Sequence, residues 1–380
     1  MSVPGSSPLP SSADFLRRAL RLAARGRYRT SPNPMVGAVV VRDGEVVGSG
    51  WHRQVGGAHA EVEALHEAGE RARGATLYVT LEPCSHFGRT PPCVDAVLAA
   101  GIARVVACHG DPDPRVSGRG FAKLREAGVE VEVGTLAAEA IRLNLRFLVA
   151  ATLRRPAVTL KWAMSLDGRI ATATGQSQWI SSPQGRRWAL ALREEHDAVL
   201  VGSGTVLADD PRLDRRLGLA AGPNTRVVMD RRLRTSPGAR LFTVEGPVLI
   251  YTRTTDRERR EALEARGAEV VVVPAVEPAA VLVELYGRGV RSVLVEGGAE
   301  ALASFVASGC YDRVMVDCAP LLIGGRGAPG PLAGPGFLEL AAAARLEDLD
   351  ARRRGGDLIL TGYRRGCLQD LLARALASRS

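Results

Sequence analysis

Four residues in the first hundred have the types and spacing of a hydrolytic zinc site. Glu61 follows His59 by two positions, and Cys84 and Cys93 each come directly after a proline. A zinc ion that does chemistry keeps three protein ligands and leaves its fourth position to water. His59, Cys84 and Cys93 supply such a set, and two thiolates also neutralise the charge of the ion. The bound water then ionises near neutral pH and becomes a nucleophile.

Glu61 is not needed as a ligand, so we expect it to move protons. It would take a proton from the water, deliver it to a ring nitrogen of the substrate and later protonate the departing ammonia. His-x-Glu followed by Pro-Cys is the arrangement of zinc deaminases, in which two residues separate the cysteines. Eight residues separate Cys84 from Cys93 here. A structural zinc, or chance cysteines beside a surface histidine, is the alternative, and the three-ligand set favours catalysis.

The elements around these residues predict an α/β/α layered domain over 13–150. Helical periodicity is followed by two apolar runs that flank Asp43-Gly44, a pair typical of a two-residue hairpin turn. His59 and Cys93 would lie at helix N-termini, where the backbone dipole favours a thiolate at Cys93. Helices are expected at 13–25, 58–68, 92–100 and 118–127, and strands at 35–42, 45–50, 75–80, 105–108 and 129–133.

Asn33 lies in a rigid loop, Ser31-Pro32-Asn33-Pro34, before the expected hairpin. Its amide is a candidate for recognising the substrate ring. A turn-forming role fits the sequence equally well, because Asn and Pro are both frequent in turns. We therefore keep both roles open for Asn33.

After residue 155 the alternation of strands and helices restarts and predicts a second α/β domain over 156–365. Strands are expected at 157–163, 197–201, 225–230, 247–252, 268–273, 291–295 and 312–318, and helices at 183–195, 256–266, 277–287 and 299–308. Glu296-Gly297-Gly298 joins a strand to a helix, and glycines there would let a pyrophosphate approach the helix N-terminus. A plain glycine-rich turn fits as well. Residues 366–380 are expected to be a C-terminal tail, either a short amphipathic helix or a loose segment.

The composition is that of an ordinary globular protein, since 24% of the 380 residues are charged and 46% are hydrophobic. No apolar run is long enough for a transmembrane helix. Residues 1–12 lack the basic start and apolar core of a signal peptide and indicate a disordered leader. We therefore expect a cytoplasmic protein without a membrane partner.

The net charge of +9 is compatible with nucleic-acid binding, but its distribution argues against it. The basic residues are almost all arginines and are scattered, apart from short clusters such as 352–354. A phosphorylated small substrate suits such a surface. Six cysteines in so long a chain do not indicate a disulfide scaffold, and Cys108, Cys310 and Cys318 are expected to be buried fillers.

With these residues in view, the chain resembles the bifunctional riboflavin biosynthesis deaminase–reductases. Residues 32–37, 59–61 and 82–93 match the deaminase half, and the Gly-Arg-Thr-Pro-Pro insertion at 88–92 separates that family from cytidine and tRNA adenosine deaminases. The resemblance implies a cytidine-deaminase-like first domain. It also implies the substrate, 2,5-diamino-6-(5-phosphoribosylamino)pyrimidin-4(3H)-one, whose 2-amino group is replaced to give 5-amino-6-(5-phosphoribosylamino)uracil.

Residues 161–169, 175–180, 204–211 and 296–298 resemble the reductase half of the same family. That resemblance implies a dihydrofolate-reductase-like fold that uses NADPH to reduce the ribosyl group to ribityl. The implied cofactor contacts are Ala163, Trp179, Thr205, Asp209, Gly298, Ala299, Glu300, Ala301, Leu302, Ala303 and Ser304. The implied substrate contacts are Ser177, Arg193, Leu213, Arg216 and Glu296, whose arginines offer planar donor forks to a phosphate.

Three further positions in the second domain carry expectations. Lys161 is a candidate for the substrate phosphate or ribose, with a solvated strand lysine as the alternative. Asp214 stands where the family commonly has threonine, and a carboxylate there would repel a phosphate. Asp214 therefore points away from the substrate or alters its affinity. Arg231 and Arg232 are candidates for the 2′-phosphate of the cofactor.

Two other functions remain open at this stage. One is a tRNA or nucleotide deaminase with an accessory nucleotide-binding domain, which the basic charge would suit and the cysteine spacing disfavours. The other is a regulatory or scaffold protein with degenerate sites, against which the intact set of His59, Glu61, Cys84 and Cys93 argues. For the leading function we expect a homo-oligomer with a phosphorylated pyrimidine as its ligand and no nucleic-acid partner.

Overall fold

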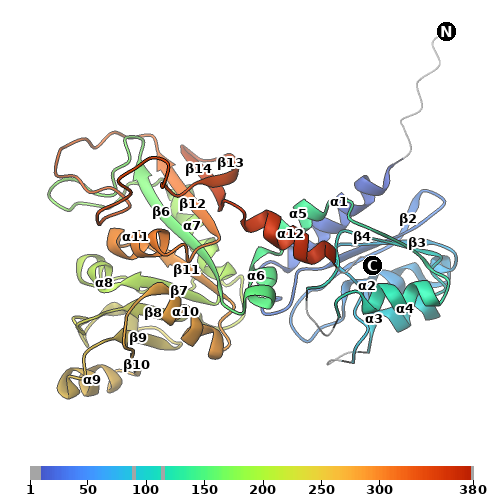
Figure 1. The fold of residues 1–380 in the computed structure, drawn as a ribbon, viewed down its shortest axis with the longest axis horizontal. Coiled ribbons are helices and arrows are strands. Elements are labelled where there is room, and N and C mark those ends of the chain that lie inside the picture. Colours follow the sequence, from blue (N-terminus) through green and yellow to red (C-terminus); the bar gives the residue numbers. More distant parts are fainter. Residues whose placement is uncertain (1–9, 88–90, 113–115, 378–380) are drawn as a thin grey trace, which may run out of the picture. The chain divides into compact units, whose positions relative to one another are not determined.

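The computed structural model describes residues 10–87, 91–112 and 116–377, which form two compact units (Figure 1). The first unit is Met1–Thr152 with Leu368–Ser380, and the second is Leu153–Cys367. The segment from 366, expected as a tail, contains the helix α12 (Cys367–Ala377), most of which belongs to the first unit. Residues 1–9 of the expected leader lie outside the described residues, and α1 begins at Ser12.

The first unit is built on a five-stranded sheet in the order β2-β1-β3-β4-β5. The pairs β1–β2 and β1–β3 are antiparallel, and the pairs β3–β4 and β4–β5 are parallel. Its elements are α1 (Ser12–Ala23), η1 (Ala24–Gly26), β1 (Gly37–Arg42), β2 (Glu45–Trp51), α2 (Ala60–Ala68), η2 (Gly69–Ala72), β3 (Thr76–Val79), α3 (Cys93–Ala99), β4 (Arg104–Ala107), α4 (Arg119–Glu126), β5 (Glu130–Val133), α5 (Ala137–Leu143) and α6 (Leu145–Leu153).

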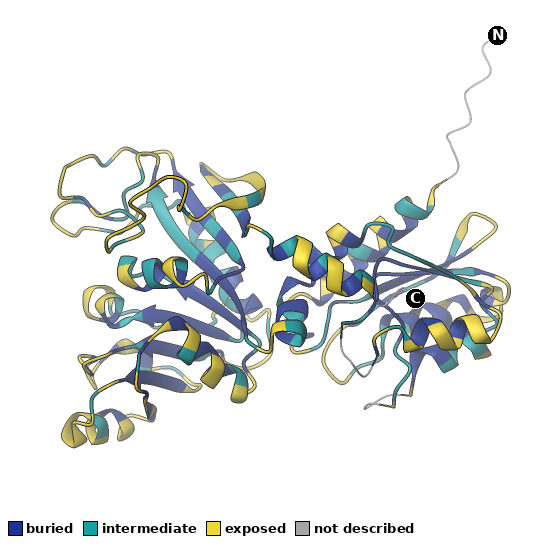
Figure 2. Cartoon of the chain, viewed as in Figure 1, coloured by how far each residue is buried: buried dark blue, intermediate teal, exposed yellow. Residues whose placement is uncertain are grey.

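Alternating side chains on the strands make this sheet the middle of three layers. Ala38 and Val40 of β1 pack in one buried cluster with residues of α2, α3 and α4. Val39 and Val41 pack on the opposite face, in a cluster that contains Phe15 of α1. Strand residues alternate between faces, so the central strands β1, β3 and β4 are buried on both sides and appear largely dark blue in Figure 2. The α/β/α arrangement expected from the sequence is confirmed.

Two glycines of β2 bring α2 close to the sheet. A Cβ atom on Gly48 would collide with the carbonyl oxygen of Ala64, and one on Gly50 would collide with that of Ala60. Hydrogen atoms at these two positions let the α2 backbone lie directly on the strand. The close approach fixes the start of α2, which carries His59 and Glu61.

The second unit has a nine-stranded sheet in the order β10-β9-β8-β7-β11-β6-β12-β14-β13. The strands are parallel from β10 to β12, and β14 and β13 complete the sheet as an antiparallel hairpin. Its elements are β6 (Ala157–Ser165), α7 (Pro183–Glu195), β7 (Ala198–Gly202), α8 (Ser203–Asp209), β8 (Thr225–Met229), η3 (Arg240–Phe242), β9 (Val248–Thr252), α9 (Arg257–Glu264), β10 (Ala268–Val272), α10 (Pro278–Gly287), β11 (Ser292–Glu296), α11 (Ala299–Ala307), β12 (Arg313–Ala319), β13 (Leu346–Arg354) and β14 (Asp357–Arg364).

Helices cover both faces of this sheet as well. Leu200 of β7 belongs to a core cluster with residues of α10 and α11, and its neighbours Val199 and Val201 belong to a second cluster with residues of α8 and α9. Those helices have a buried side and an exposed side (Figure 2). Three cysteines were predicted to be buried. Cys108 and Cys318 are buried, whereas Cys310 is only half-buried.

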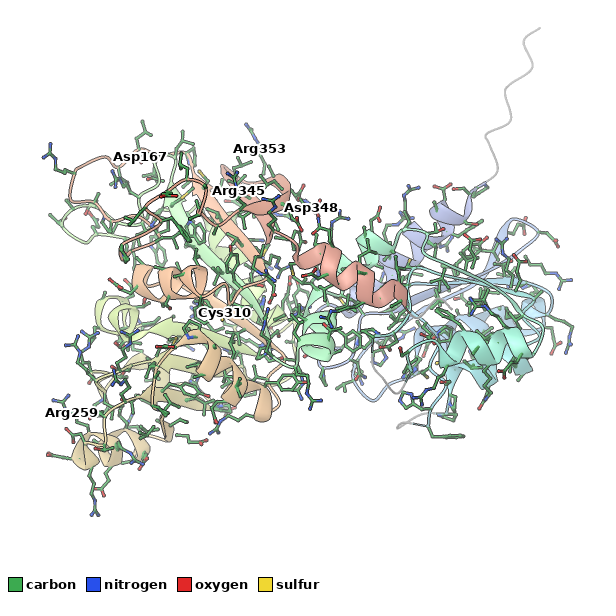
Figure 3. All side chains as sticks on the ribbon, viewed as in Figure 1. Asp167, Arg259, Cys310, Arg345, Asp348 and Arg353 are labelled. Atoms are coloured by element: carbon green, nitrogen blue, oxygen red, sulfur yellow. The ribbon has the colours of Figure 1, made fainter. Side chains whose placement is uncertain are left out.

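The basic residues of the second unit are spread over its surface. Arg259 of α9 lies far from Arg345 and Arg353, which are near β13, where Asp348 stands among them (Figure 3). No continuous basic stripe is formed by these labelled side chains. Within the ranges that the structure describes, no helix is both long and apolar enough to cross a membrane.

Candidate active sites

The three proposed zinc ligands are held by the starts of two helices and one loop. His59 is the N-cap of α2, and Cys93 is the first residue of α3, with Pro92 as its N-cap. Cys84 lies in the loop after β3. The amide of Val94 donates to the Cys84 carbonyl at 3.2 Å, which fastens this loop to α3.

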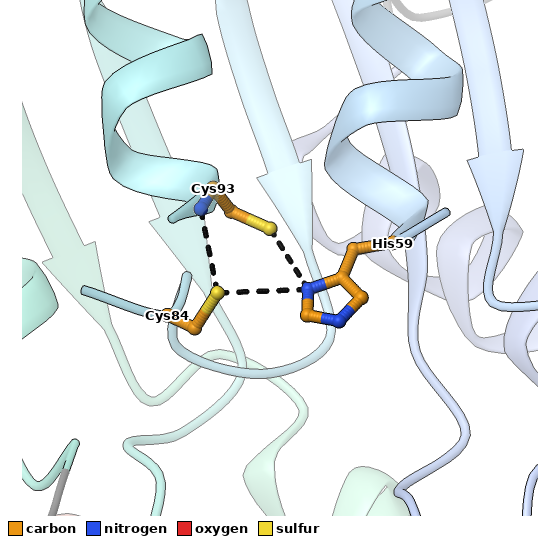
Figure 4. A group of neighbouring side chains, drawn as sticks. All are labelled: His59, Cys84 and Cys93. Carbon is orange, nitrogen blue, oxygen red and sulfur yellow. Dashed lines mark hydrogen bonds between the residues drawn. The ribbon is translucent and has the colours of Figure 1, made fainter. Parts of the chain in front are cut away.

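Their ligand atoms converge on one point (Figure 4). His59 Nδ1 lies 3.0 Å from Cys93 Sγ and 3.5 Å from Cys84 Sγ. The backbone N–H of Cys93 donates to Cys84 Sγ at 3.3 Å. Zinc bonds of about 2.0 to 2.3 Å in a tetrahedron place ligand atoms on the order of 3.5 Å apart. The three side chains therefore fit a zinc ion, and among the described residues they are the one group of three or more metal-binding side chains found this close.

The electrostatics of the group favour a thiolate. The pKa of Cys84 is lowered to about 4, because the thiol of Cys93 and the ring of His59 donate hydrogen bonds to its sulfur. The pKa of Cys93 is raised, because it keeps the proton that it donates to Cys84 and because it is buried. The hydrogen bond to Cys84 raises the pKa of His59. The lowered pKa favours the thiolate form of Cys84, which is the form that binds a cation.

Glu61 lies beside this group and is not one of the converging ligands. It is the second residue of α2 and is only 3% exposed. Burial raises its pKa to about 7, against the lowering effect of the positive charge on His59. A carboxyl group with a pKa near the working pH can both accept and return a proton.

Of the four residues, His59, Glu61 and Cys84 border a cavity of about 420 Å³, whereas Cys93 is fully buried. Asn33 also lines it, and its Nδ2 lies 3.2 Å from His52 Nε2, while His52 Nδ1 lies 3.0 Å from the carbonyl oxygen of Ala58. Burial lowers the pKa of His52, which favours the neutral ring. A neutral ring that donates from Nδ1 to Ala58 accepts from Asn33 at Nε2. Asn33 thus lies in the proline-rich turn and at the cavity wall, so both of its expected roles are compatible with its position.

Sequence reasoning did not single out several other residues of the cavity wall. They are His52, Glu82, His86, Asp111 and Phe147. Among the residues that the structure describes, none forms a hydrogen bond with the buried Nδ1 of His86. His52 and His86 lie close in sequence to His59 and Cys84, so their side chains could have been proposed as part of the site. Phe147 belongs to α6 and is far from these residues in the sequence, so no nearby motif points to it. Gly88, Arg89 and Thr90 of the insertion lie outside the described residues.

In the second unit, some of the residues proposed to contact the cofactor and the substrate lie next to one another although they are far apart in the sequence. A Cβ atom on Gly298 would lie 2.8 Å from Thr205 Oγ1, so the glycine turn before α11 touches the start of α8. Ser177 Oγ donates to Asp209 Oδ1 at 3.5 Å. Trp179 is 69% exposed and stacks with a guanidinium group. These contacts bring four of the proposed cofactor and substrate residues into two adjacent pairs.

The proposed substrate residues include a charged cluster. Arg193 donates to both carboxylate oxygens of Glu296, at 2.7 and 2.6 Å. Lys161 of β6 pairs in register with Glu296 of β11, and burial lowers the pKa of Lys161. Lys161 is half-buried, so its position is compatible with a substrate contact and does not match a fully solvated lysine. Ala163 is two residues further along the same strand.

Two proposed leucine contacts can use only backbone atoms. Leu213 is 1% exposed and packs in the core, and its carbonyl already accepts from Asn224. Leu302 is also 1% exposed, within the core cluster of α11. A ligand that reaches the 298–304 segment would meet the glycine turn and the first amides of α11.

Asp214 is 8% exposed and lies between two arginines. Arg212 pairs with one of its oxygens at 2.9 Å and Arg216 with the other at 2.7 Å. The carboxylate is thus neutralised by neighbours and does not stand as a free negative charge. Arg231 and Arg232 are exposed after β8, where the structure gives no further indication of a phosphate site.

Comparisons with known proteins agree with both sites. Residues 10–109 match the family model "Cytidine and deoxycytidylate deaminase zinc-binding region", and residues 156–360 match "RibD C-terminal domain". Riboflavin biosynthesis proteins RibD of Aquifex aeolicus and Escherichia coli are each 42% identical to the chain, over 91% of it and 97% of the relative.

The chain belongs to the RibD family.

Solved structures of the same family share its fold. RibD of Acinetobacter baumannii has a TM-score of 0.82 at 36% identity, and covers 93% of this chain and 98% of its own. A diaminohydroxyphosphoribosylaminopyrimidine deaminase/5-amino-6-(5-phosphoribosylamino)uracil reductase of Thermotoga maritima has a TM-score of 0.81 at 35% identity, with the same coverage. The fold prediction, a cytidine-deaminase-like domain followed by a dihydrofolate-reductase-like domain, is confirmed.

Membership of the RibD family establishes the class of function. The chain is a bifunctional enzyme of riboflavin biosynthesis, with a deaminase and a reductase activity. The expected cofactors, zinc for the first activity and NADPH for the second, follow from the two domains. A nucleic-acid deaminase and a degenerate scaffold protein, the two alternatives drawn from the sequence, find no support among these relatives.

Proposed function

We propose that the first unit hydrolyses 2,5-diamino-6-(5-phosphoribosylamino)pyrimidin-4(3H)-one at its 2-amino group and releases ammonia. His59, Cys84 and Cys93 would hold the zinc ion, which supplies a water of lowered pKa when it is bound. The observation that carries the proposal is the convergence of one ring nitrogen and two sulfurs, with His59 and Cys84 lining a cavity of about 420 Å³. That volume is within the range of small-molecule sites.

Glu61 is the proposed proton carrier of this reaction. It would pass one proton of the attacking water to a ring nitrogen, and then carry the proton of the newly added hydroxyl group to the departing amino group. A pKa of about 7 suits a group that must be ionised in one step and protonated in the next. Asn33, held by its contact with His52, would bind a polar edge of the pyrimidine ring.

We propose that the second unit reduces the ribosyl group of the deaminated product to ribityl. NADPH supplies the hydride, so the chain's task is to hold the cofactor and the substrate carbon close together. Thr205, Asp209 and the turn at Gly298 would border the cofactor. Lys161, Arg193 and Glu296 would face the ribose and phosphate. The remaining contacts implied by the family resemblance, including Arg231 and Arg232 for the 2′-phosphate, are part of the same proposal.

We also propose that the enzyme works as a homo-oligomer in the cytoplasm, without a nucleic-acid or membrane partner. Six free cysteines support a reducing compartment, because an oxidising one would threaten the two thiols that bind zinc. The scattered arginines support a phosphorylated small substrate rather than a polyanion.

An assay that follows ammonia and NADPH separately tests both halves. The zinc-loaded enzyme should release ammonia from the diaminopyrimidinone ribotide, and NADPH should be consumed only after deamination. Ammonia release from a polynucleotide, with none from the ribotide, would contradict the first proposal. Rapid NADPH oxidation with dihydrofolate and none with the deaminated ribotide would contradict the second.

A further inference from the structure

We propose that Glu82 is a positioning residue of the deaminase site, whose buried carboxylate fixes the loop that carries Cys84. The inference rests on the proposed role of Cys84 as a zinc ligand. Glu82 precedes Cys84 by two residues and is 3% exposed. Neither sequence reasoning nor the chemistry of deamination assigned it a task.

Four backbone N–H groups converge on the Glu82 carboxylate. Its Oε2 accepts from the amides of Asp111 and Gly118, each at 3.0 Å. Its Oε1 accepts from Gly120 at 2.9 Å and from Phe121 at 3.4 Å. A carboxylate offers about four lone-pair sites, so these donors use all of them. Glu82 therefore has no capacity left to bind substrate or to carry a proton.

The donors belong to the entry into α4 and to the loop before it. Gly120 and Phe121 lie in the first turn of α4, where amides lack intrahelical partners and the helix dipole favours a negative charge. A buried carboxylate without such partners would strongly destabilise the folded state. The arrangement is thus a satisfied anion site, filled by a side chain of the same unit.

The same contact packs the ligand loop against α4. A Cβ atom on Gly120 would collide with the carbonyl oxygen of Pro83, which lies between Glu82 and Cys84. On its other side Cys84 is held by α3, through the amides of Cys93 and Val94. The loop that carries Cys84 is therefore fastened at Glu82 to the entry of α4 and at Cys84 to the start of α3.

The contact also joins the ligand loop to the substrate cavity. Asp111, whose amide binds Glu82, lines the cavity together with Glu82 itself. Loss of the carboxylate would free the ligand loop and the cavity wall at once. Partners of metal ligands in other proteins typically change metal affinity or activity by about 10- to 100-fold when they are mutated.

Glu82→Gln in the full-length, zinc-loaded enzyme tests the inference. The amide keeps one oxygen and places an NH₂ group opposite two backbone donors, with little change in volume. We expect zinc affinity, measured by chelator competition, or deaminase kcat to fall by about 10- to 100-fold. The visible absorption of the Co²⁺-substituted enzyme should also change, because that spectrum reports ligand geometry. NADPH oxidation with the deaminated ribotide should be unchanged.

Glu67→Gln is the matched control. Glu67 of α2 accepts from the amide and hydroxyl of Ser49, at 2.9 and 3.0 Å, at the end of the helix away from His59. This control should retain the zinc affinity, Co²⁺ spectrum and deaminase kcat of the parent enzyme. A Glu82→Gln enzyme that also retains all three would overturn the proposal.

Gly120→Ala provides a second route if Glu82→Gln fails to fold. It keeps the carboxylate and presses on the Pro83 carbonyl instead. A changed Co²⁺ spectrum would support the positioning role, and an unchanged spectrum with parental kcat would overturn it. If the parent enzyme itself binds neither Zn²⁺ nor Co²⁺ at Cys84, the proposed function fails, which is a different result from a parent-like Glu82→Gln enzyme.

Discussion

Glu194→Gln should damage substrate binding in the reductase half. Glu194 is the second-to-last residue of α7 and is 1% exposed. Its Oε1 accepts from the amides of Arg216 and Leu217 at 3.1 and 2.8 Å. Its Oε2 accepts from Leu219 and Ala220 at 3.1 and 3.0 Å. This one carboxylate therefore shapes the loop that carries Arg216, a proposed substrate contact.

The size of the effect follows from the hydrogen bonds that are lost. A hydrogen bond to a charged group contributes about 1.5 to 3 kcal/mol, and glutamine can serve only one of the two donor pairs. The loss of two bonds amounts to about 3 to 6 kcal/mol. A domain of this size loses about 2 to 4 °C of melting temperature per kcal/mol, so the second unit should melt roughly 6 to 24 °C lower.

Kinetic measurements can distinguish an effect on the loop that carries Arg216 from an effect on the cofactor site or the deaminase site. KM for the deaminated ribotide should rise at a temperature where the enzyme is folded, while KM for NADPH and ammonia release stay near parental values. Glu264→Gln is the control, because Glu264 makes an exposed ion pair with Arg260 at 3.5 Å, a type worth about 0 to 1 kcal/mol. A Glu194→Gln enzyme with parental melting and parental ribotide KM would refute the reasoning.

Three further substitutions test individual side chains. Glu61→Gln should keep zinc, by metal analysis, and lose deaminase kcat by about 100- to 10,000-fold, because general acid–base catalysis typically contributes that much; retained activity would remove Glu61 as the proton carrier. Cys84→Ala should lose zinc and ammonia release while NADPH oxidation with the deaminated ribotide survives; joint loss in a folded protein would show that the activities are coupled. Asp214→Thr should release Arg212 and Arg216 from their ion pairs and lower the ribotide KM severalfold at low salt, an effect that added salt should reduce; an unchanged KM would show that neither arginine meets the phosphate.

Local patterns were sufficient to predict much of the framework. Asp43-Gly44 predicts a hairpin, and both residues have positive φ, 52° and 80°, as a two-residue turn requires. The starts of α2 and α3 were placed next to His59 and Cys93, because capping and proline signals act within a few residues. The residue types, His-x-Glu and two Pro-Cys pairs, were enough to predict that His59, Cys84 and Cys93 converge, although eight residues separate the cysteines.

Features that depend on distant partners were not predictable in this way. β13 and β14 were missed because β13 is largely exposed and carries a run of charged residues, 352–354, instead of alternating apolar ones. The assignment of most of α12 to the first unit reflects contacts such as that of the Gly110 amide with the Ala375 carbonyl, 265 positions apart in the chain. The pairing of Asp214 with two arginines likewise appears only when the loop is folded.

The number of donors around a buried carboxylate distinguishes residues that do chemistry from residues that hold it in place. Sequence presents Glu61, Glu82 and Glu194 alike, each an acid within two residues of a proposed ligand or substrate contact. Glu82 and Glu194 each accept from four backbone amides, which occupies the lone pairs that a reaction would need. Among the residues that the structure describes, no such set of amides holds Glu61, and burial raises its pKa to about 7. Its environment suits proton exchange, whereas the environments of the other two suit permanent attachment of a loop.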